Sequence, residues 1–265
     1  LYLPLIALQY HEVRIDFDLA SDMEIYLNKN IFKVYANYVY LDTEERRRFA
    51  QKGHEYLIEQ VQHTGSDTVS ASGSAQNKRL SYNHPVKELV WCFNDPATAN
   101  AATALWNFTS APAKTDIVLE SNVSAVSESN CFVPTTFASG VPLVSVGDAG
   151  STRDFTEEAV GPLSEFKLVL NGQDRFKAQK GKYFNQVQAY NHHTGCPYPG
   201  VYSYSFALKP EEHQPTGTCN FSRIDNAQVA VTLPSLCPST TMHMFAVNYN
   251  VLRIQSGMGG LSFSS

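Results

Sequence analysis

The sequence predicts an all-β protein, built as a sandwich or barrel of short strands. Short stretches of alternating apolar and polar residues recur along the chain between glycines and prolines, and convincing helical periodicity is almost absent. One strand–gap–strand pattern also occurs twice, first as 13–19 followed by 32–42 and again as 228–233 followed by 244–254. Because internal repetition determines architecture, we expect two related β units joined in tandem.

The first predicted strands lie near the start of the chain. In the segment 5–19, Val13, Ile15 and Phe17 alternate with charged residues, which is the period-two pattern of a half-buried strand. The segment 33–41 is rich in Tyr and Val and predicts a second strand.

One short helix is predicted after these strands, over about 43–52. Asp42 occupies the N-cap position and Glu45 follows three residues later, which together form a capping box. Gly53 interrupts the helix. The segment 54–61 fits either a helix or a strand, and we favour a strand.

The middle of the chain divides into strands and a long segment without pattern. A loop of small polar residues at 64–75 precedes predicted strands at 78–83 and 86–93, between which Pro85 marks a break or a sheet edge. From Asn94 to Gly161 no periodicity is visible. Loops of this length are uncommon unless they have a function.

Strand signals return in the last third of the chain. The segment 165–170 alternates regularly and is followed by Asn171-Gly172, a strong signal for a β-hairpin turn. Further strands are predicted at 201–208, 217–224, 228–233 and 242–254.

Composition narrows the function classes. The chain is 43% hydrophobic but only 17% charged, below the usual value of about 25%, which suits a β-rich protein that covers much of its surface with neighbours. The net charge of −5 argues against a dedicated nucleic-acid binder. The basic run at 46–48 stands beside two glutamates and is better explained as a solvated helix face than as a phosphate site.

The sequence contains no apolar run long enough to predict a membrane span and no signal peptide. Its first residues are already strongly apolar and it lacks an initiator Met. We therefore expect a piece of a longer protein, cut inside its first domain.

Cysteine and histidine give one candidate metal site. The five cysteines are widely spaced and form no CxxC pair, so buried thiols in a reduced compartment are expected. His192, His193 and Cys196 could supply metal ligands. Adjacent histidines in a strand point to opposite faces, however, and no second cluster is present, so a metal is not predicted.

The remaining candidates for chemistry are weak. His54-Glu55 lacks the second histidine of the zinc-protease motif, and no GxSxG elbow is present. The carboxylate pairs at 157–158 and 211–212 are adjacent rather than set across a sugar. The glycines at 257–260 indicate a tight turn or close packing rather than a phosphate loop. We therefore predict no catalytic residue, no cofactor and no metal.

Glycosylation sequons occur at Asn107, Asn122 and Asn220. The first two lie in the long patternless segment, where a sugar has room. Asn107 and Asn122 are therefore the candidate modification sites.

Blocks of sequence spread over nearly the whole chain carry a family resemblance. They look like the major capsid protein of nucleocytoplasmic large DNA viruses, especially the algal (phycodnavirus) branch, with iridovirus proteins in the same family. One small departure is Gln255, where the family often has Met. The blocks lie at 3–13, 40–50, 54–60, 170–176, 204–210, 217–226 and 249–254.

The resemblance implies a double jelly roll. Residues 1–42 would be the last strands of the N-terminal jelly roll, 43–53 a short helical bridge, and 54–265 a C-terminal jelly roll that begins with a strand at 57–63. The long loop 94–162 would be an insertion between its fourth and fifth strands.

The resemblance also implies a function without an active site. Homotrimers would form pseudo-hexameric capsomers, made late in infection and assembled in the host cytoplasm into an icosahedral virion shell. The expected partners are neighbouring capsomers and the minor capsid and penton proteins. An inner membrane would lie nearby without insertion of this chain, and no direct binding of nucleic acid is expected. The alternative is a jelly-roll carbohydrate-binding module, since lectins share this architecture.

Overall fold

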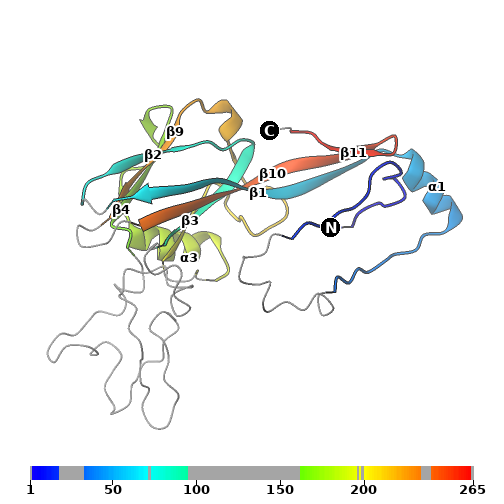
Figure 1. Cartoon of the computed structure of the whole chain (residues 1–265), viewed down its shortest axis with the longest axis horizontal. Helices are drawn as coiled ribbons and strands as arrows, with labels where there is room; N and C mark the ends of the chain where they lie inside the picture. Colours follow the sequence, from blue (N-terminus) through cyan, green and yellow to red (C-terminus); the bar gives the residue numbers. More distant parts are fainter. Residues whose placement is uncertain are drawn as a thin grey trace, which may run out of the picture. The chain divides into compact units, whose positions relative to one another are not determined.

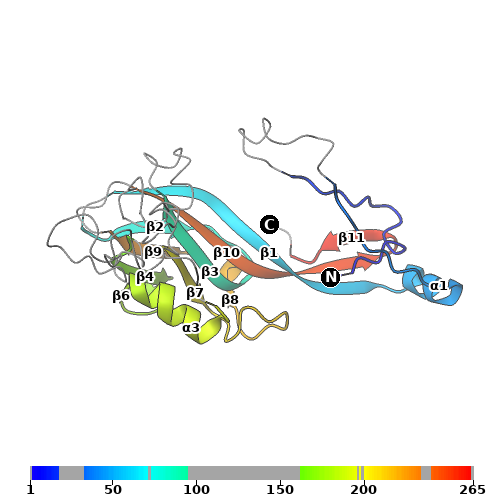
Figure 2. The same cartoon turned by 90° about the horizontal axis from the view of Figure 1, so that it is seen from below.

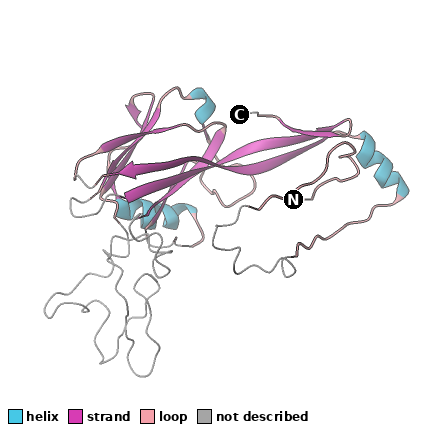
Figure 3. Cartoon of the chain, viewed as in Figure 1, coloured by secondary structure: helices cyan, strands magenta, loops and turns pink. Residues whose placement is uncertain are grey.

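The computed structural model describes residues 2–17, 33–70, 73–94, 162–195, 197, 200–233 and 240–263. Antiparallel strands dominate these residues, with a few short helices (Figure 3). The chain divides into two compact units, one formed by Leu1–Ile58 with Asn250–Ser265 and the other by Glu59–Tyr249.

Figure 1 labels most of the strands and two of the helices among the elements that follow one another along the chain. The strands are β1 His54–Val69, β2 Gln76–Leu80, β3 Pro85–Asn94, β4 Glu165–Leu170, β5 Gln173–Asp174, β6 Gln179–Lys180, β7 Val201–Ser205, β8 Cys219–Asn220, β9 Ala227–Thr232, β10 Thr240–Gln255 and β11 Met258–Leu261. The helices are α1 Thr43–Gln51, the π-helical turn η3 Tyr183–Val187, its continuation α3 Gln188–His192, and the 3₁₀ turn η4 Phe221–Arg223.

The strands form two sheets with a jelly-roll order. One sheet runs β1-β10-β3-β7, with β11 added beside β10 and β8 beside β3. The other runs β2-β9-β4-β5, with β6 beside β4. Successive strands cross between the sheets: β1 and β3 lie in the first sheet, β2 and β4 in the second, and β9 and β10 again in different sheets (Figure 2). This crossing pattern is that of a jelly roll.

An aromatic core joins the two sheets. Trp91 of β3 stacks on Phe166 of β4, with ring centroids 4.2 Å apart. Phe184 of η3 packs against both rings and is fully buried. Tyr202 of β7 stacks on Trp91 from within the same sheet. Stacked and edge-on aromatic contacts of this kind stabilise a core beyond the area they bury.

The continuous helix formed by η3 and α3 protects an open sheet edge. Among the described strands, β7 pairs only with β3, so its outer backbone groups need other partners. Asn185 Nδ2 donates to the Val201 carbonyl at 2.8 Å, and Gln188 Oε1 accepts from the Ser205 N–H at 3.2 Å. Two buried amide side chains thus cap β7 where no strand lies beside it.

Three local predictions are confirmed, the first of them in part. Asp42 accepts the Glu45 N–H at 2.9 Å, which is one half of the predicted capping box, and begins α1, which ends before Gly53. The turn at Asn171-Gly172 has φ angles of 50° and 80°, which join β4 to β5 in the expected two-residue hairpin. The predicted strand 165–170 coincides with β4.

The strand predictions at the start of the chain are wrong for the described residues. No strand is present over 2–17 or 33–42. An alternating sequence becomes a strand only where another backbone completes its ladder, and among the described residues no strand pairs with these segments. In the first compact unit, Tyr10 instead packs over Gly257, to whose carbonyl it donates its N–H at 3.0 Å.

Several boundaries also differ from the predictions. β1 continues to Val69, into the expected loop 64–75, and the expected strand 217–224 is only β8 followed by η4. The helix at 183–192 was not predicted. Among the described strands β3 is the third and β4 the fourth, so the long insertion follows the third strand, not the fourth. The insertion itself, 95–161, lies outside the described residues.

Candidate functional site

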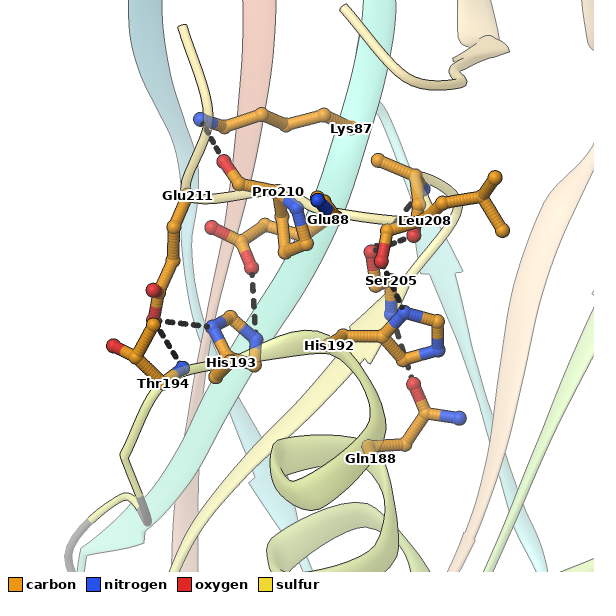
Figure 4. Close-up of polar contacts among 12 residues, drawn as sticks. Lys87, Glu88, Gln188, His192, His193, Thr194, Ser205, Leu208, Pro210 and Glu211 are labelled. Carbon is orange, nitrogen blue, oxygen red and sulfur yellow. Dashed lines mark hydrogen bonds and ion pairs between the residues drawn. The ribbon is translucent and has the colours of Figure 1, made fainter.

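A polar cluster surrounds His193 at the end of α3 (Figure 4). Its imidazole lies between two carboxylates: Nε2 is 3.3 Å from Glu88 Oε2, and Nδ1 is 3.4 Å from Glu211 Oε1. Glu88 comes from β3, whereas Glu211 comes from the connection between β7 and β8. The histidine therefore links a strand to a loop.

The pKa values of the two carboxyl groups in this cluster are shifted in opposite directions. Burial raises the pKa of the Glu88 carboxyl, and the nearby charges of His193 and Lys87 partly oppose that shift. Glu211 is more exposed, and hydrogen bonding from the Thr194 backbone lowers the pKa of its carboxyl. The Thr194 N–H donates to Glu211 Oε1 at 3.0 Å.

Lys87 holds the β7–β8 connection at a second position. Its side chain is only 5% exposed, and its Nζ lies 2.7 Å from Glu59 Oε1. The same ammonium donates to the Pro210 carbonyl at 2.7 Å and lies 5.5 Å from the centre of the Tyr249 ring. Burial, with Glu59 and Glu88 close by, raises the pKa of Tyr249.

This arrangement lacks the geometry of a catalytic triad. A triad histidine offers one ring nitrogen to a carboxylate and the other to a nucleophile. In His193 both nitrogens face carboxylates. The nearby Ser205 hydroxyl donates to the Ala207 carbonyl at 2.7 Å. The contacts hold the β7–β8 connection against β3 and α3.

The predicted candidates for chemistry are not brought together. His192 Nδ1 lies 3.0 Å from the Leu208 carbonyl, away from His193, and Cys196 is outside the described side chains. No group of three or more His, Cys, Asp or Glu suited to a metal occurs among the described residues. Nothing in the sequence pattern indicated that Glu88 and Lys87 would join His193, because they are about a hundred positions away.

Other sequence candidates have structural roles. His54 Nε2 lies 2.8 Å from the Phe49 carbonyl, and Glu55 pairs with Arg253 at 2.8 Å. Glu212 pairs with Lys209. Gly257 has φ of 82° in the β10–β11 turn, and a Cβ there would lie 2.7 Å from the Tyr10 ring. The glycine cluster is thus a turn with close packing, as predicted.

The sequon residues divide between described and undescribed parts of the chain. Asn107 and Asn122, the candidate glycosylation sites, lie outside the described residues, as does the pair 157–158. Asn220 ends β8, where its side-chain oxygen accepts the Ser222 N–H at 3.1 Å. No helix among the described residues combines the length and apolar character of a membrane span.

Large apolar side chains are exposed in the segments 2–17 and 33–40. Six apolar residues of the segments predicted as strands are between 47% and 66% exposed; they are Leu5, Val13, Ile15, Phe17, Val34 and Tyr38. Exposed apolar surface of this extent is typical of an interaction region.

The topology defines a jelly-roll protein, and large apolar side chains lie exposed on its first segments. The family model described as "Large eukaryotic DNA virus major capsid protein" matches residues 45–260. The chain belongs to this family of capsid proteins, which are structural proteins rather than enzymes.

Individual relatives agree with this assignment. The chain is 42% identical to the major capsid protein of Paramecium bursaria Chlorella virus 1 and 38% identical to that of Phaeocystis pouchetii virus, over its whole length. It spans 63% and 62% of the lengths of these relatives.

Solved structures show the same likeness. A chain of the PBCV-1 virus capsid matches with a TM-score of 0.60 and 37% identity, over 86% of this chain and 56% of that one. The Faustovirus major capsid protein matches with a TM-score of 0.50 and 16% identity, over 82% of this chain and 36% of that one, which shows the fold alone.

Proposed function

We propose that this chain is part of the shell-forming subunit of an icosahedral capsid of a large DNA virus. Its copies associate as homotrimers, and these pseudo-hexameric capsomers pack against neighbouring capsomers. The observation that carries the proposal is the likeness to a chain of the PBCV-1 virus capsid, at a TM-score of 0.60 and 37% identity. Membership of the capsid family supports it.

The proposed domain organisation explains the exposed apolar segments. Residues 1–42 belong to an N-terminal jelly roll, 43–53 form the bridge that contains α1, and 54–265 form the C-terminal jelly roll. Strands elsewhere in the N-terminal jelly roll would cover the side chains of Val13, Ile15 and Phe17, which are exposed here. Those strands would also offer the backbone partners that a β ladder over this segment requires.

A size measurement tests the function. The full-length protein should elute as a trimer in size exclusion with light scattering and show hexagonal outlines in electron micrographs. A monomer that is retained on a sugar column would instead favour the carbohydrate-binding alternative.

A dye experiment tests the domain proposal. The isolated chain 1–265 should increase the fluorescence of a hydrophobic dye, and the full-length protein should not. A dye-silent, monomeric 1–265 would contradict it.

The long insertion is proposed to lie on the outer surface of the capsid. The segment 94–162 is rich in Ser, Thr, Ala and Asn and poor in charge, and burying it would leave many backbone groups without partners. Any glycan would be attached at Asn107 or Asn122 rather than at Asn220. Limited proteolysis of intact particles should cut first in this segment. Mass spectrometry of the released peptides then shows whether they carry sugars. Cleavage of core strands before the insertion would contradict the placement.

The remaining partners complete the proposal. The protein would reside in the virion shell, after assembly in the host cytoplasm, and would contact minor capsid and penton proteins. An inner membrane would lie close to the shell without insertion of this chain. The net charge of −5 is consistent with an absence of direct nucleic-acid binding.

A further inference from the structure

A pocket with a basic rim lies where α1 meets β1. It has a volume of about 440 Å³ and is lined by residues 48, 49 and 52–56, all within the first compact unit. Arg48 and Lys52 supply the cationic side chains. Neither side chain makes an ion pair or hydrogen bond within the part of the chain that the structure describes.

The other groups of the pocket leave these two charges uncompensated. Glu55 also lines the pocket, but its carboxylate is paired with Arg253 at 2.8 Å. The last carbonyls of α1 are occupied as well: Lys52 N–H donates to the Arg48 carbonyl, and His54 Nε2 lies 2.8 Å from the Phe49 carbonyl. An anionic group entering the pocket would therefore find two cations without competing partners.

One wall of the pocket is aromatic. The rings of Phe49 and His54 lie 5.2 Å apart, and those of His54 and Tyr56 stack at 6.2 Å. All three residues line the pocket and are half-buried. A ligand that matches this site carries an apolar group beside its negative charge.

The strand that begins at the pocket offers a backbone edge. Among the described strands, β1 pairs only with β10 and is the outermost strand of its sheet. An extended peptide can add to such an edge by main-chain hydrogen bonds while its side chains enter neighbouring pockets. A nucleic-acid backbone offers neither peptide groups nor exposed apolar side chains to this site.

From this geometry we propose that the α1–β1 pocket binds an acidic peptide segment of a partner protein. A carboxylate of the segment pairs with Arg48 and Lys52, an apolar side chain packs against Tyr56 and Phe49, and its backbone follows the start of β1. This site goes beyond the proposed shell function, because it specifies one surface and the chemistry of what binds there.

A peptide titration tests the site. The full-length protein is titrated into a short fluorescein-labelled peptide in which Asp and Glu flank a single Leu, and fluorescence anisotropy is followed. A matched peptide with Asn and Gln in place of the acids should not bind. The double variant Arg48→Gln, Lys52→Gln should weaken binding by about tenfold, the loss expected when two solvent-exposed ion pairs are removed together. Binding should also weaken as salt is added.

The control variant is Arg47→Gln. Arg47 is on the same helix and equally cationic, but it pairs with Glu44 at 3.2 Å and does not line the pocket. It should leave the affinity within about twofold of the wild type. Melting temperatures of all variants should match, since none of these side chains is buried.

Three results would overturn the proposal. An equal loss of affinity in Arg47→Gln would mean diffuse charge attraction. Tighter binding of duplex DNA or of phosphatidylglycerol vesicles than of the acidic peptide would mean a phosphate site instead. If the anisotropy of the acidic peptide does not rise even at millimolar protein, the pocket has no such partner.

Discussion

Lys87 Nζ lies 2.7 Å from Glu59 Oε1, and this pair holds a loop as well as two strands together. The lysine is buried on β3, and its ammonium also binds the Pro210 carbonyl in the β7–β8 connection. A charge that is only 5% exposed is tolerated because a carboxylate, a carbonyl and the Tyr249 ring surround it. The buried side chain of Lys87 thus fixes the β7–β8 connection, which is far from β3 in the sequence.

Lys87→Ala should lower the free energy of unfolding by about 2–3 kcal/mol, because the Pro210 carbonyl loses its donor and Glu59 loses its partner. Urea unfolding of the full-length protein measures the loss. Lys209→Ala is the matched control, since Lys209 forms an exposed pair with Glu212 that should contribute no more than about 1 kcal/mol. Equal losses in the two variants would show that the buried pair has no special role.

Gly181 has a packing requirement that Gly195 lacks. A Cβ on Gly181 would lie 2.2 Å from the Leu163 carbonyl oxygen, whereas a Cβ on Gly195 would meet nothing within 4 Å. Gly181→Ala should therefore destabilise the protein by about 1–3 kcal/mol or more, because backbone must move to make room. Gly195→Ala should have little effect on the melting temperature. A wild-type melting temperature in Gly181→Ala would show that this contact relaxes freely.

Local features of the fold could be predicted from the sequence, and features fixed by distant partners could not. The hairpin at Asn171-Gly172 and the cap at Asp42 depend on neighbouring residues, so their signals are complete in the sequence. The helix at 183–192 was missed because part of its buried face is polar. Asn185 and Gln188 are buried there and form hydrogen bonds with the edge of β7, which lies further along the chain.

The same reasoning applies to the candidate site. The sequence drew attention to His192 and His193, but the partners of His193 come from β3 and from the loop after β7. The histidine pair was considered as a metal site and not predicted to be one, but the sequence alone did not reveal the carboxylates that His193 contacts instead. Over the described residues 5–17 and 33–41 the strand predictions failed for a related reason. Alternation describes a face but does not supply the backbone that must pair with it.

Tyr82 should make the protein sensitive to alkaline pH. Burial raises the pKa of its phenol to about 12, and the hydroxyl donates to the Met244 carbonyl at 2.8 Å. Between the ordinary pKa of 10.0 and about 12 the folded protein retains a proton that the unfolded chain loses, so the free energy of unfolding falls as pH rises through this range.

Tyr82→Phe should lower stability at neutral pH by about 1–2 kcal/mol, because the Met244 carbonyl loses its donor. It should also make the alkaline decline smaller than in the wild type. Tyr204 and Tyr249 also have raised pKa values, so part of the decline should remain. Urea unfolding at successive pH values above 9 measures both effects, and an unchanged alkaline decline would show that Tyr82 does not contribute.

Phe184 anchors the helix that covers the edge of β7. Its ring is fully buried between Trp91 and Phe166, the aromatic pair that joins the two sheets. Phe184→Ala should lower the free energy of unfolding by about 3–5 kcal/mol through lost burial and the cavity left behind. Tyr190→Ala removes an aromatic ring from the same helix, but that residue is 87% exposed, so a change within about 0.5 kcal/mol is expected.

The two variants also separate packing from helix formation. Both replace an aromatic residue by alanine, the residue with the highest helix propensity, so neither should weaken the helix itself. A large loss confined to Phe184→Ala would therefore report the contact between the helix and the sheets. The Ser205 N–H donates to Gln188 Oε1. Hydrogen exchange at this N–H should become faster in Phe184→Ala and remain slow in Tyr190→Ala. Equal exchange in both variants would mean that the helix is held to β7 by its amide side chains and not by the aromatic core.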